Sequence, residues 1–198
     1  MPDPIILASG SASRAKMLRD AGVEIVVERP RVDEEAVKAS LRAEGAPPRA
    51  QVDALAEVKA LSVSRMRPGL VIGADQMLVL GKQVFDKPTN RVEAREQLKA
   101  LSGQTHHLMN AAVVALEGAI VWRQIATPRL RMRPLSDAFI ERYLDEAGDD
   151  AFTSVGAYKL EGRGGQLFED VSGDFFSILG LPLLPLLAFL RERGALEK

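Results

Sequence analysis

The stretch from Ile72 to Pro88 carries two charged residues, Asp75 and Lys87, at positions where the pattern predicts strand core. Asp75 follows the apolar run 70–74, which has the length and bulk of a buried strand. A turn signal at Gly81-Lys82 then predicts a hairpin that brings Lys87 back toward Asp75. The sequence therefore predicts that a carboxylate able to act as a base and a cationic side chain share one end of a sheet.

A second chemical candidate is the loop that joins a short buried strand, 5–8, to a helix expected at about 12–21. The loop holds Ser9 and Ser11, and Arg14 lies in the first turn of the helix. Free backbone N–H groups and the positive end of the helix dipole make such a helix start an anion site. The alternative is an ordinary N-cap at Ser11 with Arg14 facing solvent. The segment alone favours this alternative, because the loop matches no Walker or dinucleotide fingerprint.

Three adjacent acids, Asp33, Glu34 and Glu35, follow a strand predicted at 24–28. Acids at a helix start are favoured by the helix dipole and are commonly solvated. Their oxygens are also the donors that a hard divalent ion prefers. The sequence leaves both interpretations open, a solvated helix start and a metal site.

Lys59 lies on the inward face of a helix predicted at 49–65. The apolar residues that share this face at helical spacing are Val52, Leu55, Ala56 and Val63. A lysine in such a position either extends to the rim of the core or directs its ammonium into a cleft, where it can bind phosphate. Strands and helices alternate along the chain up to the strand at 70–74, which predicts an α/β layer arrangement.

The last third of the chain contains a glycine-rich segment around Glu161. Residues 156–165 predict a strand that enters a glycine-rich loop, with Glu161 on the loop. Glycines at this density indicate tight backbone, either for packing or for close approach to a ligand.

The charge balance gives no field that would steer the protein toward nucleic acid or an anionic membrane. Lys plus Arg count 26 against 27 Asp plus Glu, a net charge of −1. A half-exposed strand is predicted at 124–133, and the arginines on its outer face are interpreted as solvated because no aromatic residues interleave with them. We therefore expect neither a nucleic-acid nor a membrane partner, and any anionic ligand must be bound by a local cluster of cations.

The length and composition are those of a globular protein. With 198 residues the chain can bury one core, and we expect a single domain over 1–198. It has no cysteine, which excludes disulfides, zinc-thiolate sites and thiol catalysis and favours a cytoplasmic location. We expect no signal peptide, because no basic region precedes the first apolar run. The apolar run 178–190 contains two prolines and is too short to span a bilayer.

A set of short motifs runs in order along nearly the whole chain: LASGSASR, DEE, AEVKA, IGADQ, FDKP, LSG, VGAYKLEG and SGDFFSILGLPL. Each motif is weak by itself, but the set resembles the Maf family of nucleotide pyrophosphatases. The resemblance implies a two-lobed, ITPase-like α/β fold with a twisted mixed β-sheet, helices packed on it and a cleft between the lobes. It also implies a house-cleaning hydrolase that splits nucleoside triphosphates into nucleoside monophosphate and pyrophosphate with a divalent metal cation, Mg²⁺ or Mn²⁺.

The resemblance further implies roles for particular residues. By position, the catalytic residues are Asp75 and Lys87, the phosphate-binding residues are Ser9, Ser11, Arg14 and Lys59, and the metal ligands are Glu34 and Asp75. These residue types suit the reaction, because attack of water on the α-phosphorus needs a base, cations for the phosphate oxygens and a metal for the leaving group. Which of the two acids binds the metal directly is left open.

Three positions bear on which nucleobase is bound: Ser13, Gln76 and Glu161. By the same resemblance, we expect the family branch that acts on 7-methyl-GTP to have Trp, Gln and Glu at these positions. The branch that acts on UTP and dTTP is expected to have Arg, Thr and Gln. Guanine presents N1–H and an amino group as adjacent donors, which Glu161 can accept, whereas uracil and thymine would present carbonyl oxygens to it. We therefore expect 7-methyl-GTP to be the substrate.

Two alternatives to this activity stay open. One is a dTTP/UTP-type pyrophosphatase of the same family, since Ser13 cannot stack on a cationic ring as Trp would. The other is a non-catalytic nucleotide-binding regulator of septum formation, which would need the cleft but no base. The sequence also leaves the oligomeric state open, with a homodimer among the alternatives.

Overall fold

The computed structural model describes residues 4–197, which form two compact units. The first unit comprises the chain up to Gln76, Asn110–Ala126 and the chain from Gly180 onward, and the second comprises Met77–Met109 and Thr127–Leu179. Within residues 4–197, eight strands form a mixed sheet in the order β2-β1-β3-β5-β7-β8, with β4 beside β3 and β6 beside β5. Helices flank this sheet, so the predicted α/β class is confirmed.

The strands of the first unit are parallel around β1 (Ile5–Ala8). This strand pairs on one side with β2 (Ile25–Glu28) and on the other with the beginning of β3 (Leu70–Leu80). Ala8, the last residue of β1, pairs with Glu28 and with Gly73. β1 and β2 therefore end at the same level, whereas β3 continues past Gly73 to Leu80. Antiparallel pairing of β5 (Thr105–Leu116) with β6 (Ala119–Ala126) completes the strands of this unit.

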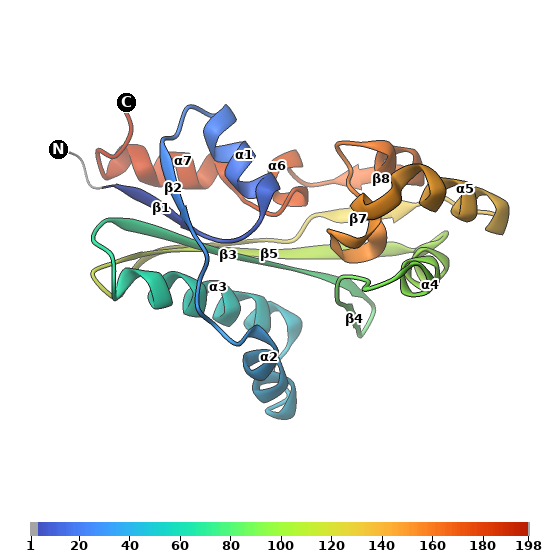
Figure 1. Ribbon diagram of the computed structural model, residues 1–198, viewed down its shortest axis with the longest axis horizontal. Coiled ribbons are helices and arrows are strands. Elements are labelled where there is room, and N and C mark those ends of the chain that lie inside the picture. Colours follow the sequence, from blue (N-terminus) through green and yellow to red (C-terminus); the bar gives the residue numbers. More distant parts are fainter. Residues whose placement is uncertain (1–3, 198) are drawn as a thin grey trace. The chain divides into compact units, whose positions relative to one another are not determined.

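Helices cover both faces of these strands (Figure 1). They are α1 (Ala12–Asp20), α2 (Glu34–Ala43), α3 (Pro48–Ser64) and α7 (Leu183–Glu192). In Figure 1, α1 and α7 lie on one face and α3 on the other, with α2 against α3. Two successive residues of β6 contact helices on opposite faces of the sheet, because side chains alternate along a strand. Trp122 stacks on Phe189 of α7, and Arg123 forms ion pairs with α3.

The second unit contains the hairpin that the turn signal at Gly81-Lys82 predicted. The end of β3 pairs with β4 (Gln83–Phe85), and Leu80 is the partner of Gln83. On the other side of the unit, β7 (Arg129–Met132) lies between the beginning of β5 and β8 (Phe168–Ser172). The helices are α4 (Arg91–Leu101), α5 (Asp137–Ala147) and α6 (Phe175–Ile178), with 3₁₀ turns at Gly148–Phe152, Val155–Ala157 and Arg163–Leu167.

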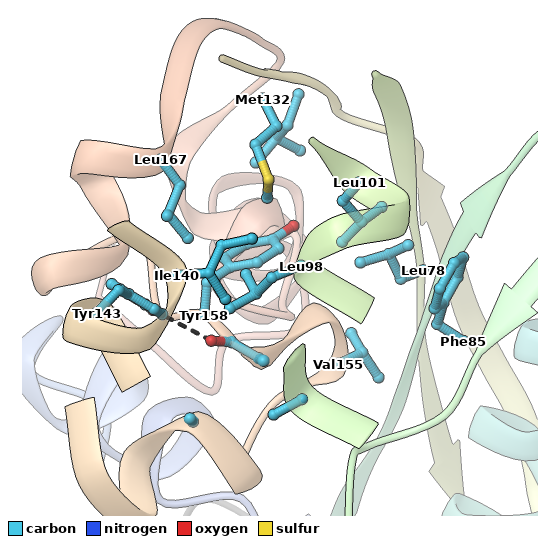
Figure 2. Packing of buried hydrophobic residues seen from close by; sticks show 14 of the residues in the cluster. Leu78, Phe85, Leu98, Leu101, Met132, Ile140, Tyr143, Val155, Tyr158 and Leu167 are labelled. Atoms are coloured by element: carbon cyan, nitrogen blue, oxygen red, sulfur yellow. Dashed lines mark hydrogen bonds between the residues drawn. The ribbon is translucent and has the colours of Figure 1, made fainter. Parts of the chain in front are cut away.

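A mainly apolar core fills the second unit (Figure 2). Leu98 and Ile140 project into it from α4 and α5, and Tyr158 lies among them. Both tyrosine hydroxyls of this core have hydrogen-bond partners. His106 Nε2 lies 2.7 Å from the Tyr158 hydroxyl, and the Tyr143 hydroxyl donates to the Ala157 carbonyl at 3.1 Å.

Two sequence-based expectations about the strands are wrong. The strand expected at 124–133 is two strands, because β6 ends at Ala126 and β7 begins at Arg129, with Pro128 between them. Residues 156–165 form turns and not a strand. A Cβ atom at Gly164 would lie only 2.4 Å from the Lys159 carbonyl oxygen, so these glycines allow the backbone to fold tightly on itself.

The arginines on the outer face of β7 form ion pairs with β8. Arg129 contacts Asp170 at 3.5 Å, and Arg131 contacts Glu169. All four side chains remain at least partly exposed, in agreement with the expected solvated face. Among residues 4–197 there is no helix long and apolar enough to cross a membrane.

Candidate active site

Arg14 is buried at the start of α1, with only 9% of its surface exposed. Its Nε donates to the carbonyl of Gly180 at 2.8 Å, and its Nη1 donates to the carbonyl of Ala74 at 3.0 Å and to Ser9 Oγ at 3.3 Å. Burial lowers the pKa of this guanidinium, while the charges of Asp75 and Glu34 act in the opposite direction. The solvent-facing alternative for Arg14 is therefore wrong.

The loop before α1 is ordered by its own hydroxyl groups. Ser9 Oγ accepts a hydrogen bond from the Ser11 amide at 3.2 Å, and Ser11 Oγ accepts one from the Arg14 amide at 3.4 Å. The predicted N-cap at Ser11 is thus confirmed. Because Arg14 also donates to Ser9, the loop and the guanidinium are held as one group.

Lys59 joins two acids that lie far apart in the sequence. Its Nζ lies 2.7 Å from Glu34 Oε2 and 2.7 Å from Asp75 Oδ1. The lysine side chain is 7% exposed and that of Asp75 is 11% exposed, whereas Glu34 at the start of α2 is 42% exposed. Lys59 therefore directs its ammonium toward acids at the candidate site and does not extend to the rim. Of the three adjacent acids, Asp33 is the N-cap of α2, and Glu34 is the one that contacts Lys59.

The close approach of α3 to β3 depends on Gly73, a residue that sequence reasoning did not single out. A Cβ atom at Gly73 would lie 2.2 Å from the Ala56 carbonyl oxygen and 2.6 Å from the Ala60 amide nitrogen. No side chain fits at this position, so the helix backbone rests directly on the strand. This packing brings Lys59 of α3 within hydrogen-bonding distance of Asp75, two residues beyond Gly73.

Gly180 is a second glycine whose role the sequence did not reveal. Its φ is +102°, and its carbonyl accepts from Arg14 Nε. A Cβ atom here would lie 3.3 Å from Arg14 Nε and 3.6 Å from Gln76 Oε1. Gly180 thus lies against the predicted phosphate-binding arginine and against a residue predicted to bind the base. Its position in the motif SILGLPL, just before α7, was the available signal.

The model of Maf-like proteins matches residues 4–193 of this sequence. The chain belongs to the Maf family. Among curated relatives, a nucleoside triphosphate pyrophosphatase of Hyphomonas neptunium is 52% identical over 192 residues, which cover 97% of each chain. A 7-methyl-GTP pyrophosphatase of Mesorhizobium japonicum is 49% identical over the whole of both chains. A protein of the same name from Rhizobium meliloti is 48% identical over 98% of each chain.

The first unit of this Maf protein gathers most of the predicted site residues. It contains Ser9, Ser11, Ser13, Arg14, Glu34, Lys59, Asp75 and Gln76. Ser13 is half-buried in the first turn of α1. The contacts described above join Ser9, Ser11, Arg14, Glu34, Lys59 and Asp75 directly or through the Ala74 carbonyl.

Lys87 and Glu161 of this Maf protein belong to the second unit. Lys87 is exposed and follows β4. Glu161 is exposed in the turn before the 3₁₀ segment Arg163–Leu167 and lines a cavity of about 470 Å³. The proximity of Lys87 to Asp75 and the approach of Glu161 to a base stay predictions.

Two carboxylates in the first unit have the chemistry of a divalent-metal site. Glu34 and Asp75 converge on one ammonium, so their oxygens are already directed at a common cationic position. No group of three or more potential His, Cys, Asp or Glu ligands occurs within residues 4–197. Mg²⁺ is commonly held by one or two carboxylates together with water and substrate phosphates, so a pair of acids fits this ion.

Proposed function

We propose that this Maf protein hydrolyses nucleoside triphosphates to nucleoside monophosphate and pyrophosphate. The observation that carries the proposal is the cluster in which the buried Lys59 contacts the buried Asp75 and the partly exposed Glu34, beside the buried Arg14. Burying charges is costly, and clusters of buried charges are concentrated at functional sites. Full-length relatives that are about half identical and are called nucleoside triphosphate pyrophosphatase support the same activity.

Asp75 is proposed to be the general base. Its Oδ1 is engaged by Lys59, and Oδ2 forms no hydrogen bond with any residue in the range 4–197. Oδ2 accepts a proton from a water molecule as the water oxygen forms a bond to the α-phosphorus. The bond from the α-phosphorus to the α,β-bridging oxygen breaks, and the electron pair leaves with pyrophosphate.

Cationic side chains are proposed to bind the phosphate oxygens during this step. Arg14 and Lys59 lie beside Asp75 in the first unit, and Ser9 and Ser11 supply the adjoining loop. We assign Lys87 to the same task. A divalent metal held by Glu34 and Asp75, Mg²⁺ or Mn²⁺, would supply positive charge to neutralise the phosphate oxygens.

The proposed substrate is 7-methyl-GTP. Gln76 and Glu161 support this choice, because a carboxylate accepts from the adjacent N1–H and amino groups of guanine and opposes the carbonyl oxygens of uracil and thymine. Methylation at N7 adds positive charge to the ring, which a carboxylate also favours. Relatives about half identical over nearly the full chain are called 7-methyl-GTP pyrophosphatase.

A nucleotide panel tests this function. Purified protein with Mg²⁺ or Mn²⁺ is offered 7-methyl-GTP, GTP, UTP and dTTP, and pyrophosphate and monophosphate are quantified. We expect 7-methyl-GTP to give the highest kcat/KM, a loss of activity in EDTA, and a smaller preference over UTP in Glu161→Gln. Faster turnover of UTP or dTTP would overturn the substrate assignment. Nucleotide binding without pyrophosphate release would overturn the enzymatic proposal and favour the regulator of septum formation.

Three broader expectations accompany this function and stay predictions. They are a single domain over residues 1–198, a cytoplasmic location and a homodimer as one of the possible assemblies. Light scattering during size-exclusion chromatography measures the last directly.

A further inference from the structure

Arg29 lies at the edge of the sheet where the phosphate loop and Asp75 also lie. Ala8 pairs with Glu28 in β2 and with Gly73 in β3, so Ser9 and Arg29 follow the carboxyl ends of β1 and β2 at the level of Ala74, within β3. Ligands of α/β proteins bind beyond the carboxyl ends of parallel strands. β1 and β3 already contribute Ser9 and Asp75 there, and Arg29 is the residue with which the chain leaves β2.

The Arg29 side chain lies along the loop that the serines form. A Cβ atom at Gly10 would be 3.6 Å from Arg29 Nε and 4.0 Å from its Cγ. Because Gly10 has no side chain, the guanidinium lies close to the backbone between Ser9 and Ser11. A phosphate bound by that loop would therefore also be within reach of the planar Arg29 guanidinium, in addition to Arg14 and Lys59.

Arg29 also differs from the other cations of the site in how its charge is used. Arg14 donates to two carbonyls and a hydroxyl, and Lys59 contacts two carboxylates. Some other exposed arginines of the first unit, such as Arg67 and Arg123, have acidic partners. Arg29 is exposed, and within residues 4–197 it forms neither an ion pair nor a side-chain hydrogen bond. Its charge is therefore available to an anion.

We propose that Arg29 binds the polyphosphate of the substrate where it meets the Ser9–Ser11 loop. The proposal rests on the proposed function and adds to it a cation that the motifs do not include. A triphosphate carries several negative charges, and the acids Glu34 and Asp75 offset part of the charge of Arg14 and Lys59. The Arg29 guanidinium has no acidic partner in the described part of the chain, so it adds positive charge that is not offset by a carboxylate. It also offers two parallel N–H donors to phosphate oxygens.

Two variants and a matched control test the role of Arg29. Arg29→Ala removes the charge, and Arg29→Lys keeps it but loses the bidentate geometry. Arg19→Ala removes another exposed arginine, from the last turn of α1 at the end of the helix away from the loop. For each protein, kcat and KM are measured with the preferred nucleotide and Mg²⁺. The Kd for inorganic triphosphate is measured by calorimetry, and folding is followed by thermal unfolding.

We expect Arg29→Ala to raise KM and the Kd for inorganic triphosphate by roughly ten- to a hundred-fold, with kcat changed much less. Arg29→Lys should lie between Arg29→Ala and wild type, and Arg19→Ala should match wild type. Unchanged KM and Kd in Arg29→Ala, or an equal change in Arg19→Ala, would overturn the role of Arg29. If wild type hydrolyses no nucleotide, the proposed function fails, and the Kd values for inorganic triphosphate still decide whether Arg29 binds phosphate.

Discussion

The two units of the molecule bury different kinds of polar group. Among residues 4–197, the buried charged side chains are Arg14, Lys59 and Asp75, and all three belong to the first unit. In the second unit, the buried His106 and Tyr158 are paired in an apolar core. Burial lowers the pKa of His106 to about 4 and raises that of Tyr158, so both remain neutral near pH 7.

This difference indicates that the buried polar groups of the first unit serve catalysis, whereas the core of the second unit serves stability. A buried ion pair contributes little net stability, because desolvation offsets the attraction between the charges. Apolar burial contributes about 25 cal/mol per Å² without such a penalty. Isosteric substitutions of the buried charged residues of the first unit should therefore change activity more than stability, and truncations in the apolar core of the second unit should do the reverse.

The largest effect is expected from Asp75→Asn. The amide keeps the shape of the carboxylate but cannot accept the proton, so kcat should fall by roughly 10²- to 10⁴-fold. Lys59 retains Glu34 as a partner, so the melting temperature should change little. The control is Asp53→Asn. This substitution removes the charge of an α3 acid that pairs with Arg123, and it should keep near-normal turnover. Near-normal turnover in Asp75→Asn would rule out its role as the base.

Leu98→Ala should produce the opposite pattern. Leu98 is fully buried in the core of the second unit, and truncating such a leucine costs about 2–5 kcal/mol in the free energy of unfolding. Urea unfolding measures this loss. The kcat of the folded fraction should stay within about threefold of wild type, since Leu98 lies in the core and not among the site residues. A selective loss of kcat with unchanged stability would contradict the proposed division between the units.

The buried His106 should make stability depend on pH. Its pKa is about 4 in the folded protein against 6.5 in the unfolded chain, chiefly because of burial, so the unfolded state binds more protons between these values. This contribution is complete above about pH 6.5 and is lost as the pH falls toward 4, by roughly 3 kcal/mol in total. In His106→Gln, the stability difference between pH 7 and pH 4 should shrink by a similar amount. Equal pH dependence of both proteins would show that His106 does not titrate in this way.

The smallest effect is expected from Gly180→Ala. Comparison with Gly45→Ala separates the effect of backbone strain from that of a steric contact with site residues. Gly180 and Gly45 both have positive φ, but a Cβ atom at Gly45 would meet nothing within 4 Å. Both alanine variants should lose on the order of 1 kcal/mol of stability. Gly180→Ala alone should also lower kcat/KM by about tenfold, because its Cβ would lie only 3.3 Å from Arg14 Nε and would shift the guanidinium. An equal loss of kcat/KM in Gly45→Ala would assign the effect to backbone strain.

Local features of the sequence determined much of the fold and part of the candidate site. The strand at Ile5–Ala8, the N-cap at Ser11, the hairpin around Gly81-Lys82 and the inward face of α3 all follow from capping, turn and periodicity signals. Such signals act over one or two turns of helix or a few strand residues. They directed Lys59 inward, but they did not specify its partners.

The tertiary structure decided which distant groups meet. Arg14 is held by a carbonyl 166 residues away, Lys59 by acids on α2 and β3, and Arg29 lies by the Ser9–Ser11 loop because β1 and β2 are in parallel register. Helix packing at Gly73 sets the distance between Lys59 and Asp75. The sequence by itself determined the residue types and the local elements of this Maf protein. Sheet register and helix packing, which act between segments remote in the chain, determined how its charges are paired.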